Sequence, residues 1–153
     1  MMLVSLAVAA FQSAGLGQAP SPEAWTVLAR HDQGLVAVDR SNVAREAEGT
    51  VQYWAMAALT GGDTMYGTGY AYEIYRWTVD CERMTFSVDE GIDYGPEGQI
   101  REFEPASEPQ PPQEMPPGSL IYRVADAVCR DRWGDEAPQP SALDVYRLSP
   151  AVD

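Results

Sequence analysis

Apolar and polar residues alternate through most of the first hundred positions, in short runs separated by turn-forming residues. Such alternation is typical of strands in a sheet with one buried face. We expect an antiparallel meander with strands at 24–31, 35–39, 50–59, 69–79, 84–88 and 99–103 and a short extended piece at 41–45. The glycine-rich stretch 61–69 predicts a loop, and 91–98 predicts a turn.

A helical period replaces the alternation after residue 118. A helix over 120–130 is predicted by one apolar face, made of Ile121, Val124, Ala125, Val128 and Cys129. Ser119 is a favourable N-cap for this helix. Three turns are too few for a helix to be stable alone, so we expect it to pack on the sheet. The proline-rich stretch 104–117 predicts an extended connector.

The first nineteen residues carry no charge, and 2–11 form an apolar run. That run has the length of a signal-peptide core and is too short for a spanning helix, which needs about 20 apolar residues. We therefore expect a signal peptide at 1–19, a domain at 20–133 and a loosely ordered tail at 134–153, in which 142–148 is a candidate for one more short element. The mature chain is expected to be exported to the periplasm, cell surface or medium, with no integral membrane segment.

Two cysteines connect the predicted strands to the predicted helix. Cys81 ends the strand-like run that contains Tyr75, Trp77 and Val79 on the same face, and Cys129 lies on the apolar face of the helix. In an oxidising compartment, an even pair predicts one disulfide. The alternative is two free thiols in a cytosolic protein. The predicted fold class is α+β, with about six antiparallel strands and one C-terminal helix pinned to the sheet by a disulfide.

The charge of the chain narrows the range of partners. It has 10 arginines, no lysine and 23 acidic residues, which give a net charge of −13 at pH 7. Such a surface repels phosphate backbones and anionic headgroups, so nucleic acid is not expected as a partner. The single histidine and two distant cysteines do not make a zinc-ligand set, and we expect no metal and no cofactor.

The sequence offers no set of residues that predicts catalysis. We interpret His31 with Asp32 as a solvated turn, and the acid pairs 89–90 and 135–136 as surface charge. The serines have no activating partner visible in the sequence. Asp63, Asp89 and Asp93 do not have the spacing of a calcium loop. We therefore expect a protein without enzymatic activity.

The longest predicted strand has a second face, made of Tyr70, Tyr72, Ile74 and Arg76. Because one helix covers only one side of a sheet, we expect this second face to be exposed, together with Trp54 and Met56 from the neighbouring strand. Exposed aromatic residues beside arginine are typical of interfaces. We hypothesise that this face binds a protein partner or a second copy in a homodimer. The alternative is that loops or the C-terminal tail cover it.

The motifs, taken in order, resemble one known family. They are the V-x-V-D-R-S-x-V-A-R stretch ending at Arg45, the strand with Trp54, V-D-C at 79–81, Y-G at 94–95, P-P-G-S at 116–119 and a helix ending at Cys129. Over roughly 25–130 the chain is similar to the surface-adhesin protein E-like family of exported bacterial proteins.

The resemblance implies a six-stranded antiparallel sheet, with a C-terminal helix tied to its concave side by a disulfide at the positions of Cys81 and Cys129. It also implies a non-enzymatic surface adhesin, since the namesake of the family binds host matrix proteins and plasminogen. This chain differs in having no lysine and no cysteine near the leader for a lipid anchor. An accessory or structural protein of the periplasmic envelope is the alternative function, and an uncharacterised hydrolase is a third.

Overall fold

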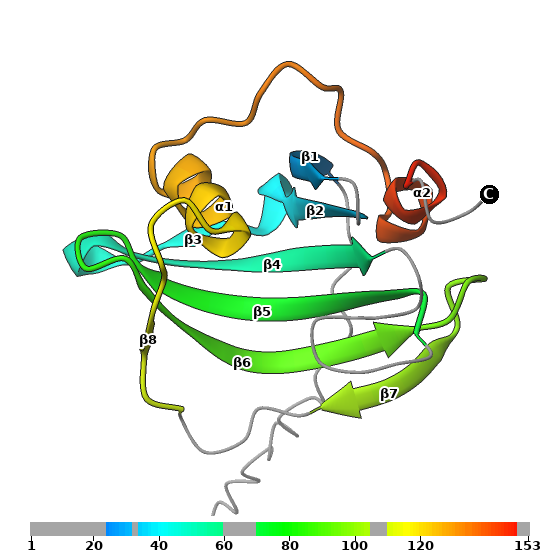
Figure 1. Ribbon diagram of the computed structural model, residues 1–153, viewed down its shortest axis with the longest axis horizontal. Coiled ribbons are helices and arrows are strands. Elements are labelled where there is room, and N and C mark those ends of the chain that lie inside the picture. The colour runs from blue at the N-terminus through cyan, green and yellow to red at the C-terminus, as the bar shows by residue number, and fades with distance from the viewer. Residues whose placement is uncertain (1–23, 32–33, 60–69, 105–109, 150–153) are drawn as a thin grey trace, which may run out of the picture.

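The computed structural model describes residues 24–31, 34–59, 70–104 and 110–149, apart from the side chains of residues 31, 47, 59 and 104 (Figure 1). The strands are β1 (Trp25–His31), β2 (Gly34–Asp39), β3 (Ala44–Arg45), β4 (Thr50–Leu59), β5 (Tyr72–Asp80), β6 (Thr85–Tyr94), β7 (Ile100–Glu104) and β8 (Gln113–Glu114). The helical elements are the 3-10 turns η1 (Arg40–Asn42) and η2 (Ala47–Gly49) and the helices α1 (Leu120–Cys129) and α2 (Ala142–Arg147). The expected signal peptide and the loop at 61–69 lie outside the described residues.

All strand pairs of the sheet are antiparallel, in the order β1-β2-β4-β5-β6-β7. The two-residue strands β3 and β8 add to it by pairing with β4 and β6. The predicted antiparallel meander of about six strands is therefore confirmed. Among the described residues, no helix combines the length and the apolar character that crossing a membrane requires.

The turn expected at 91–98 begins four residues later than the sequence suggests. Strand β6 continues through Gly91, which pairs with Tyr75 of β5, and the turn is closed by hydrogen bonds among residues 95–99. A Cβ atom on Gly91 would lie 2.1 Å from Cε1 of Tyr75, so the glycine leaves the space that the tyrosine ring fills. Gly91 therefore serves packing within a strand rather than a turn.

Helix α1 covers one face of the sheet, as the sequence predicts. The Ser119 hydroxyl caps its first turn by accepting from the Tyr122 amide at 3.2 Å. The residues that form the core beneath it include Val38, Tyr53, Ala55, Trp77, Val79, Phe86, Val124, Ala125 and Val128. The face of β5 with Tyr75, Trp77 and Val79, which the sequence analysis placed on the same side as the helix, is thus buried under α1.

Helix α2 covers the opposite face of the sheet. The second core consists of Trp25, Leu35, Ala37, Met56, Ala58, Tyr72, Ile74, Ala142, Val145 and Tyr146. In Figure 1, α1 lies across β3 and β4, whereas α2 lies near the end of β4. The fold is therefore a sheet with helical cover on both sides.

The segment 134–149 is part of the packed domain, which corrects the expectation of a loosely ordered tail at 134–153. Gln139 and Trp25 exchange two backbone hydrogen bonds of 2.9 and 2.7 Å. Glu136 pairs with Arg30 at 2.9 Å, and α2 confirms the candidate element at 142–148. This segment therefore packs against β1 on the face of the sheet opposite α1.

Candidate functional site

A disulfide joins Cys81, directly after β5, to Cys129, the last residue of α1, with 5.7 Å between the two Cα atoms. The predicted bond is therefore confirmed. Such a Cα separation is usual for disulfides and needs no displacement of either element. The bond fixes the C-terminal end of α1 over the sheet, and Leu120 and Ile121 pack the N-terminal turn of the helix against the core.

Arg45 of β3 reinforces the same end of α1. Its guanidinium donates to the Val128 carbonyl at 2.8 Å and lies 3.3 Å from the Asp131 carboxylate. A positive charge near the last carbonyls of a helix is stabilising because the helix dipole is negative there. The arginine that ends the sequence motif thus has a structural role in placing α1.

The hypothesis of an exposed second face on β5 is wrong for its central residues. Tyr72 and Ile74 are each 2% exposed, and Met56 of β4 is fully buried. The physical reason is α2, whose Tyr146 ring lies 5.3 Å from that of Tyr72. Tyr94 stacks on Tyr72 with 4.8 Å between the ring centres. Burial, with the nearby tyrosines, raises the pKa of Tyr72 to about 12.

Arg76 and Trp54 remain partly exposed on this face. The guanidinium of Arg76 lies 5.8 Å from the centre of the Trp54 ring, 2.9 Å from Glu90 and 3.6 Å from Asp89. Asp89 is the extra residue of a bulge in β6 and accepts from Thr78 at 2.7 Å. Because two carboxylates neutralise Arg76, this cluster does not offer a free cation to an anionic ligand.

Tyr70, the first residue of the proposed face, lies before β5. Its hydroxyl donates to the carboxylate of Glu102 in β7 at 2.5 Å. Glu102 lies directly opposite Asp93 on the neighbouring strand. Both residues are on the face of the sheet that α2 does not cover. The structure therefore does not bring Tyr70, Tyr72, Ile74 and Arg76 together as one exposed surface.

Exposed apolar side chains lie instead on β7, which the sequence analysis did not single out. Ile100 is 56% exposed and Phe103 is 46% exposed. They pair with Tyr94 and Ile92 of β6, so both lie on the side of the sheet that α2 covers. Within the described part of the chain, β7 is hydrogen-bonded on one side only. We call Ile100 and Phe103 the edge surface.

The polar residues considered for catalysis have structural partners or lie apart. The Asp39 carboxylate accepts from the Ser41 amide at 3.1 Å and from its hydroxyl at 2.7 Å, and Ser119 caps α1. Asp89 and Asp93 lie on opposite faces of β6, and Asp63 and the side chain of His31 lie outside the described residues. No group of three or more metal-binding side chains is found among the residues described.

One pair of buried acids was missed by sequence reasoning. Glu73 and Asp93 are directly opposite each other on β5 and β6 and are almost fully buried. The Tyr75 hydroxyl lies 3.4 Å from the Asp93 carboxylate. Charged residues in an alternating strand predict an exposed face, so the sequence carried no signal for this burial.

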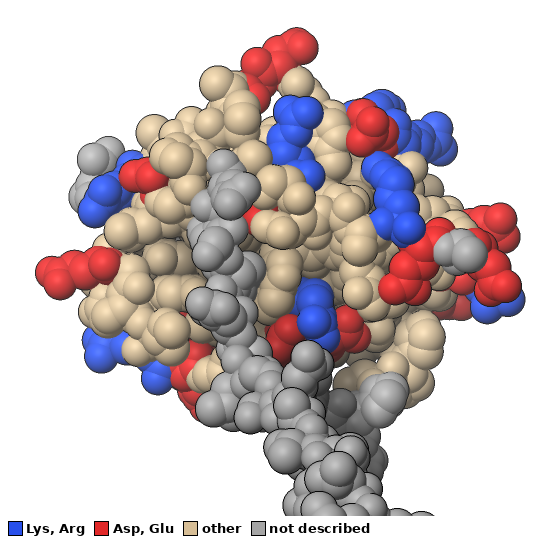
Figure 2. Space-filling view, turned by 180° about the vertical axis from the view of Figure 1, so that it is seen from behind, with Lys and Arg blue, Asp and Glu red and all other residues tan. Residues whose placement is uncertain are grey.

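The surface behind the sheet carries charges of both signs. In Figure 2, arginine and acidic side chains are interspersed and most of the visible surface is uncharged. Several arginines pair with acids, such as Arg130 with Asp126 at 2.8 Å. Exposed pairs of this kind add little stability, but they reduce the positive charge available to a partner. The excess of acid therefore remains the dominant electrostatic property.

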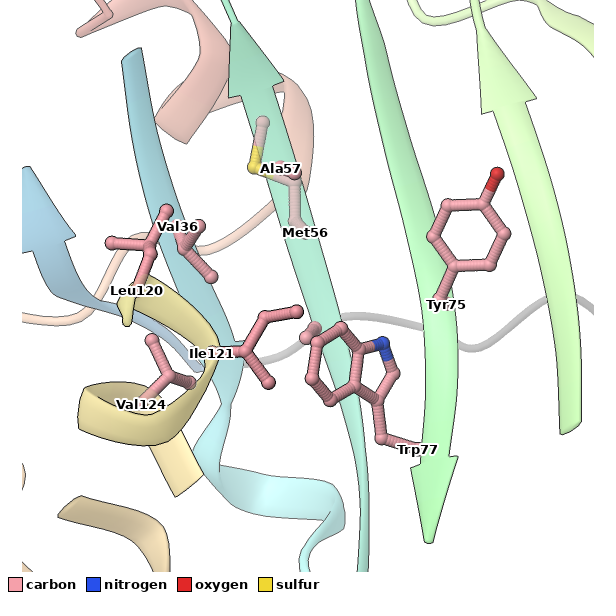
Figure 3. A pocket seen from close by; sticks show the side chains of 9 residues that line it. Val36, Met56, Ala57, Tyr75, Trp77, Leu120, Ile121 and Val124 are labelled. Atoms are coloured by element: carbon pink, nitrogen blue, oxygen red, sulfur yellow. The ribbon is translucent and has the colours of Figure 1, made fainter. Parts of the chain in front are cut away.

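An apolar pocket lies on the other side, between the first turn of α1 and strands β2, β4 and β5 (Figure 3). Its cavity volume is about 20 Å³, measured as the space open to the centre of a water-sized sphere, within about 360 Å³ of empty space that includes open solvent. Leu120 and Ile121 of α1 form one wall, and Tyr75 and Trp77 of β5 form the other. The pocket has the size to admit the end of an aliphatic group.

Comparison with known proteins places this fold in a family. The model of the protein family "Surface-adhesin protein E" matches residues 25–130 of the chain. The chain belongs to the surface-adhesin protein E family. The match covers both cysteines, the sheet and α1, and ends before the segment that contains α2. Membership makes this an adhesin-like protein, in agreement with the resemblance drawn from the sequence.

A solved structure supports the same conclusion about the fold. The crystal form II structure of Haemophilus influenzae protein E matches with a TM-score of 0.50 and 13% sequence identity, over 77% of this chain and 98% of that chain. At this identity the likeness concerns the fold alone. No curated protein matches the chain.

Proposed function

We propose that this member of the surface-adhesin protein E family is an exported, non-enzymatic module that binds a protein partner through the edge surface. The observation that carries the proposal is the exposure of Ile100 and Phe103 on a strand that, among the described residues, is hydrogen-bonded on one side only. Natural sheets usually protect such edges, because an open edge with apolar side chains pairs readily with another chain.

The charge of the chain indicates which partners the edge surface favours. A net charge of −13 steers basic or neutral proteins toward the domain and repels acidic ones. Phe103 and Ile100 would supply the apolar contact, while Arg101 and Glu102 between them alternate in sign. A second copy of this chain is the competing occupant of the edge.

Surface plasmon resonance tests the proposal with the domain from residue 20 onward, passed over immobilised host matrix proteins and plasminogen. Ile100→Ser with Phe103→Ser should weaken binding at least about 10-fold, because apolar anchors supply most of the affinity of an interface. Leu148→Ser is the matched control, since Leu148 is 52% exposed and lies outside the edge surface. Equal binding by the double variant and the wild type would refute the proposed surface.

Export to the cell surface is part of the same proposal. Family membership and the apolar leader support it, whereas the alternative is an accessory protein of the periplasmic envelope. Protease added to intact cells separates the two: we expect the mature domain to be degraded. Degradation only after the outer membrane is permeabilised would support the periplasmic alternative.

A further inference from the structure

Two rows of side chains cross the sheet and end at β7, one row on each face. On the face that α2 covers, Ile74 of β5 lies opposite Ile92 of β6, which lies opposite Phe103 of β7. The two isoleucines are each 2% exposed, whereas Phe103 is 46% exposed. This apolar row is therefore buried inside the sheet and reaches solvent at its last member.

The row on the opposite face is acidic. Glu73 of β5 lies opposite Asp93 of β6, which lies opposite Glu102 of β7. Glu73 and Asp93 are 1% and 4% exposed, while Glu102 is exposed. The Tyr70 hydroxyl donates to Glu102, but a carboxylate accepts several hydrogen bonds, and no arginine of the described residues pairs with it. A negative charge is thus available to a partner at the end of this row.

Arg101, the basic residue of β7, lies outside both rows. Ile100 and Glu102 pair with consecutive residues of β6, which leaves Arg101 as the extra residue of a bulge. A bulged residue is not paired in the ladder of hydrogen bonds between strands. The charge in register with the buried acids is therefore that of Glu102.

We propose that β7 binds an extended segment of a partner polypeptide as an added strand, and that this segment carries a lysine or arginine opposite Glu102 and an apolar residue opposite Phe103. The inference rests on the proposed function, because it names the kind of partner that the edge surface takes. Side chains of a strand alternate between the two faces, so a single extended segment continues both rows. Backbone hydrogen bonds to β7 supply affinity, and the alternation of basic and apolar residues supplies specificity.

A second copy of this chain fits the same edge poorly. Two β7 strands paired antiparallel about a two-fold axis place Glu102 opposite Glu102, or opposite Glu104 in the next register that keeps the faces aligned. Like charges directly opposite each other destabilise a pair of strands. The acidic row therefore favours a segment that brings a cation over another β7.

Nitrogen-15 NMR of the mature domain at low salt tests strand addition with the synthetic peptide acetyl-Ser-Val-Lys-Val-Lys-Val-Ser-amide. The backbone amide signals of residues 100–104 should shift, and nuclear Overhauser contacts should join α protons of the peptide to those of β7. The dissociation constant expected for a strand this short is on the order of 1 mM. No shift with the peptide at about 10 mM would overturn the proposal.

Two further peptides test the charge and the alternation separately. The counterpart with glutamate in place of both lysines should bind at least about 10-fold more weakly, because it brings like charge to the acidic row. Acetyl-Ser-Lys-Lys-Val-Val-Val-Ser-amide keeps the composition of the lysine peptide but mixes basic and apolar side chains on both faces, and should bind several-fold more weakly. Binding of either control peptide equal to that of the lysine peptide would overturn the proposal.

Glu102→Gln tests the acidic row with almost no change in the size of the side chain. It should weaken binding of the lysine peptide about 5- to 10-fold and remove most of the preference for this peptide over its glutamate counterpart. Glu82→Gln is the matched control, because it removes an exposed acid from the turn after β5 and should preserve both properties. An unchanged preference in Glu102→Gln would overturn the proposal.

Ile100→Ser with Phe103→Ser distinguishes failure of this inference from failure of the proposed function. The double variant should lose the lysine peptide, and peptide binding equal to that of the wild type would place the peptide away from β7 and overturn the inference. If the double variant loses matrix proteins in surface plasmon resonance while Glu102→Gln keeps its peptide preference, the edge binds a protein that the acidic row does not select. That result overturns the inference and leaves the proposed function in place.

Discussion

Gly91 controls the packing of a large side chain from the neighbouring strand. The Tyr75 ring occupies the volume that a side chain on Gly91 would need. We predict that Gly91→Ala lowers the free energy of unfolding by about 1–3 kcal/mol, since overpacking forces the ring or the strand to shift. Urea denaturation measures the change. In a Tyr75→Leu background the same substitution should cost much less, and an equal cost in both backgrounds would contradict the steric explanation.

Tyr72 should make stability sensitive to alkaline pH. Its pKa is raised from 10.0 to about 12 in the folded state, chiefly by burial. Folding therefore favours the protonated phenol: its contribution is complete below pH 10 and is lost as the pH rises from 10 to 12. Tyr72→Phe should flatten the decline of the unfolding free energy as the pH rises from about 10 to about 12. An identical pH dependence in wild type and variant would contradict this assignment.

For two individual residues, the sequence suggested a local structure or an exposure that the fold does not have. A glycine beside Ile92 and Asp93 suggests a turn, because sequence alone does not reveal that an aromatic ring fills its place. Glu73 suggests an exposed position, although it is buried opposite Asp93. Ser119 was predicted correctly as an N-cap, because capping depends on residues only three positions apart.

At the scale of elements, the disulfide is the main attachment of α1. Cys81→Ala with Cys129→Ala should lower the free energy of unfolding by about 4 kcal/mol, the loop-closure term for a loop of 48 residues. Arg45 and the apolar face of α1 should still hold the helix in place without denaturant. Urea denaturation of the double variant and of the reduced wild type measures the loss. A change below about 1 kcal/mol in both would show that packing, not the bond, holds α1.

The two helices differ in how well the sequence predicts them. Helix α1 has a cap, an apolar face and a cysteine, all of which are local signals. Helix α2 is only six residues long and lies among prolines, so its apolar residues Ala142, Val145 and Tyr146 are too few to establish a helical period in the sequence. Its position over Tyr72 and Ile74 depends on contacts between distant parts of the chain. The sequence therefore predicted correctly which residues of β5 share a face. It did not predict that the face with Tyr72 and Ile74 is buried.

At the scale of the whole molecule, the sequence was sufficient for the fold class and the family. Strand alternation, the cysteine pair and the order of motifs each reflect the same antiparallel sheet with a pinned helix. The edge surface was not predictable, because the residues of a strand do not determine whether it lies in the middle or at the edge of the sheet. Only the arrangement of β6 and β7 shows that Ile100 and Phe103 lie at an open edge in the described chain.

Photo-crosslinking on intact cells tests the central claim, that the domain binds a protein partner through its β7 edge. A photoreactive phenylalanine is placed at Phe103 and, as a control, at the exposed Arg123 of α1. We expect a discrete polypeptide adduct from position 103, heavier than a dimer of this chain, and none from position 123. Equal labelling from both positions, or no adduct from position 103, would contradict it.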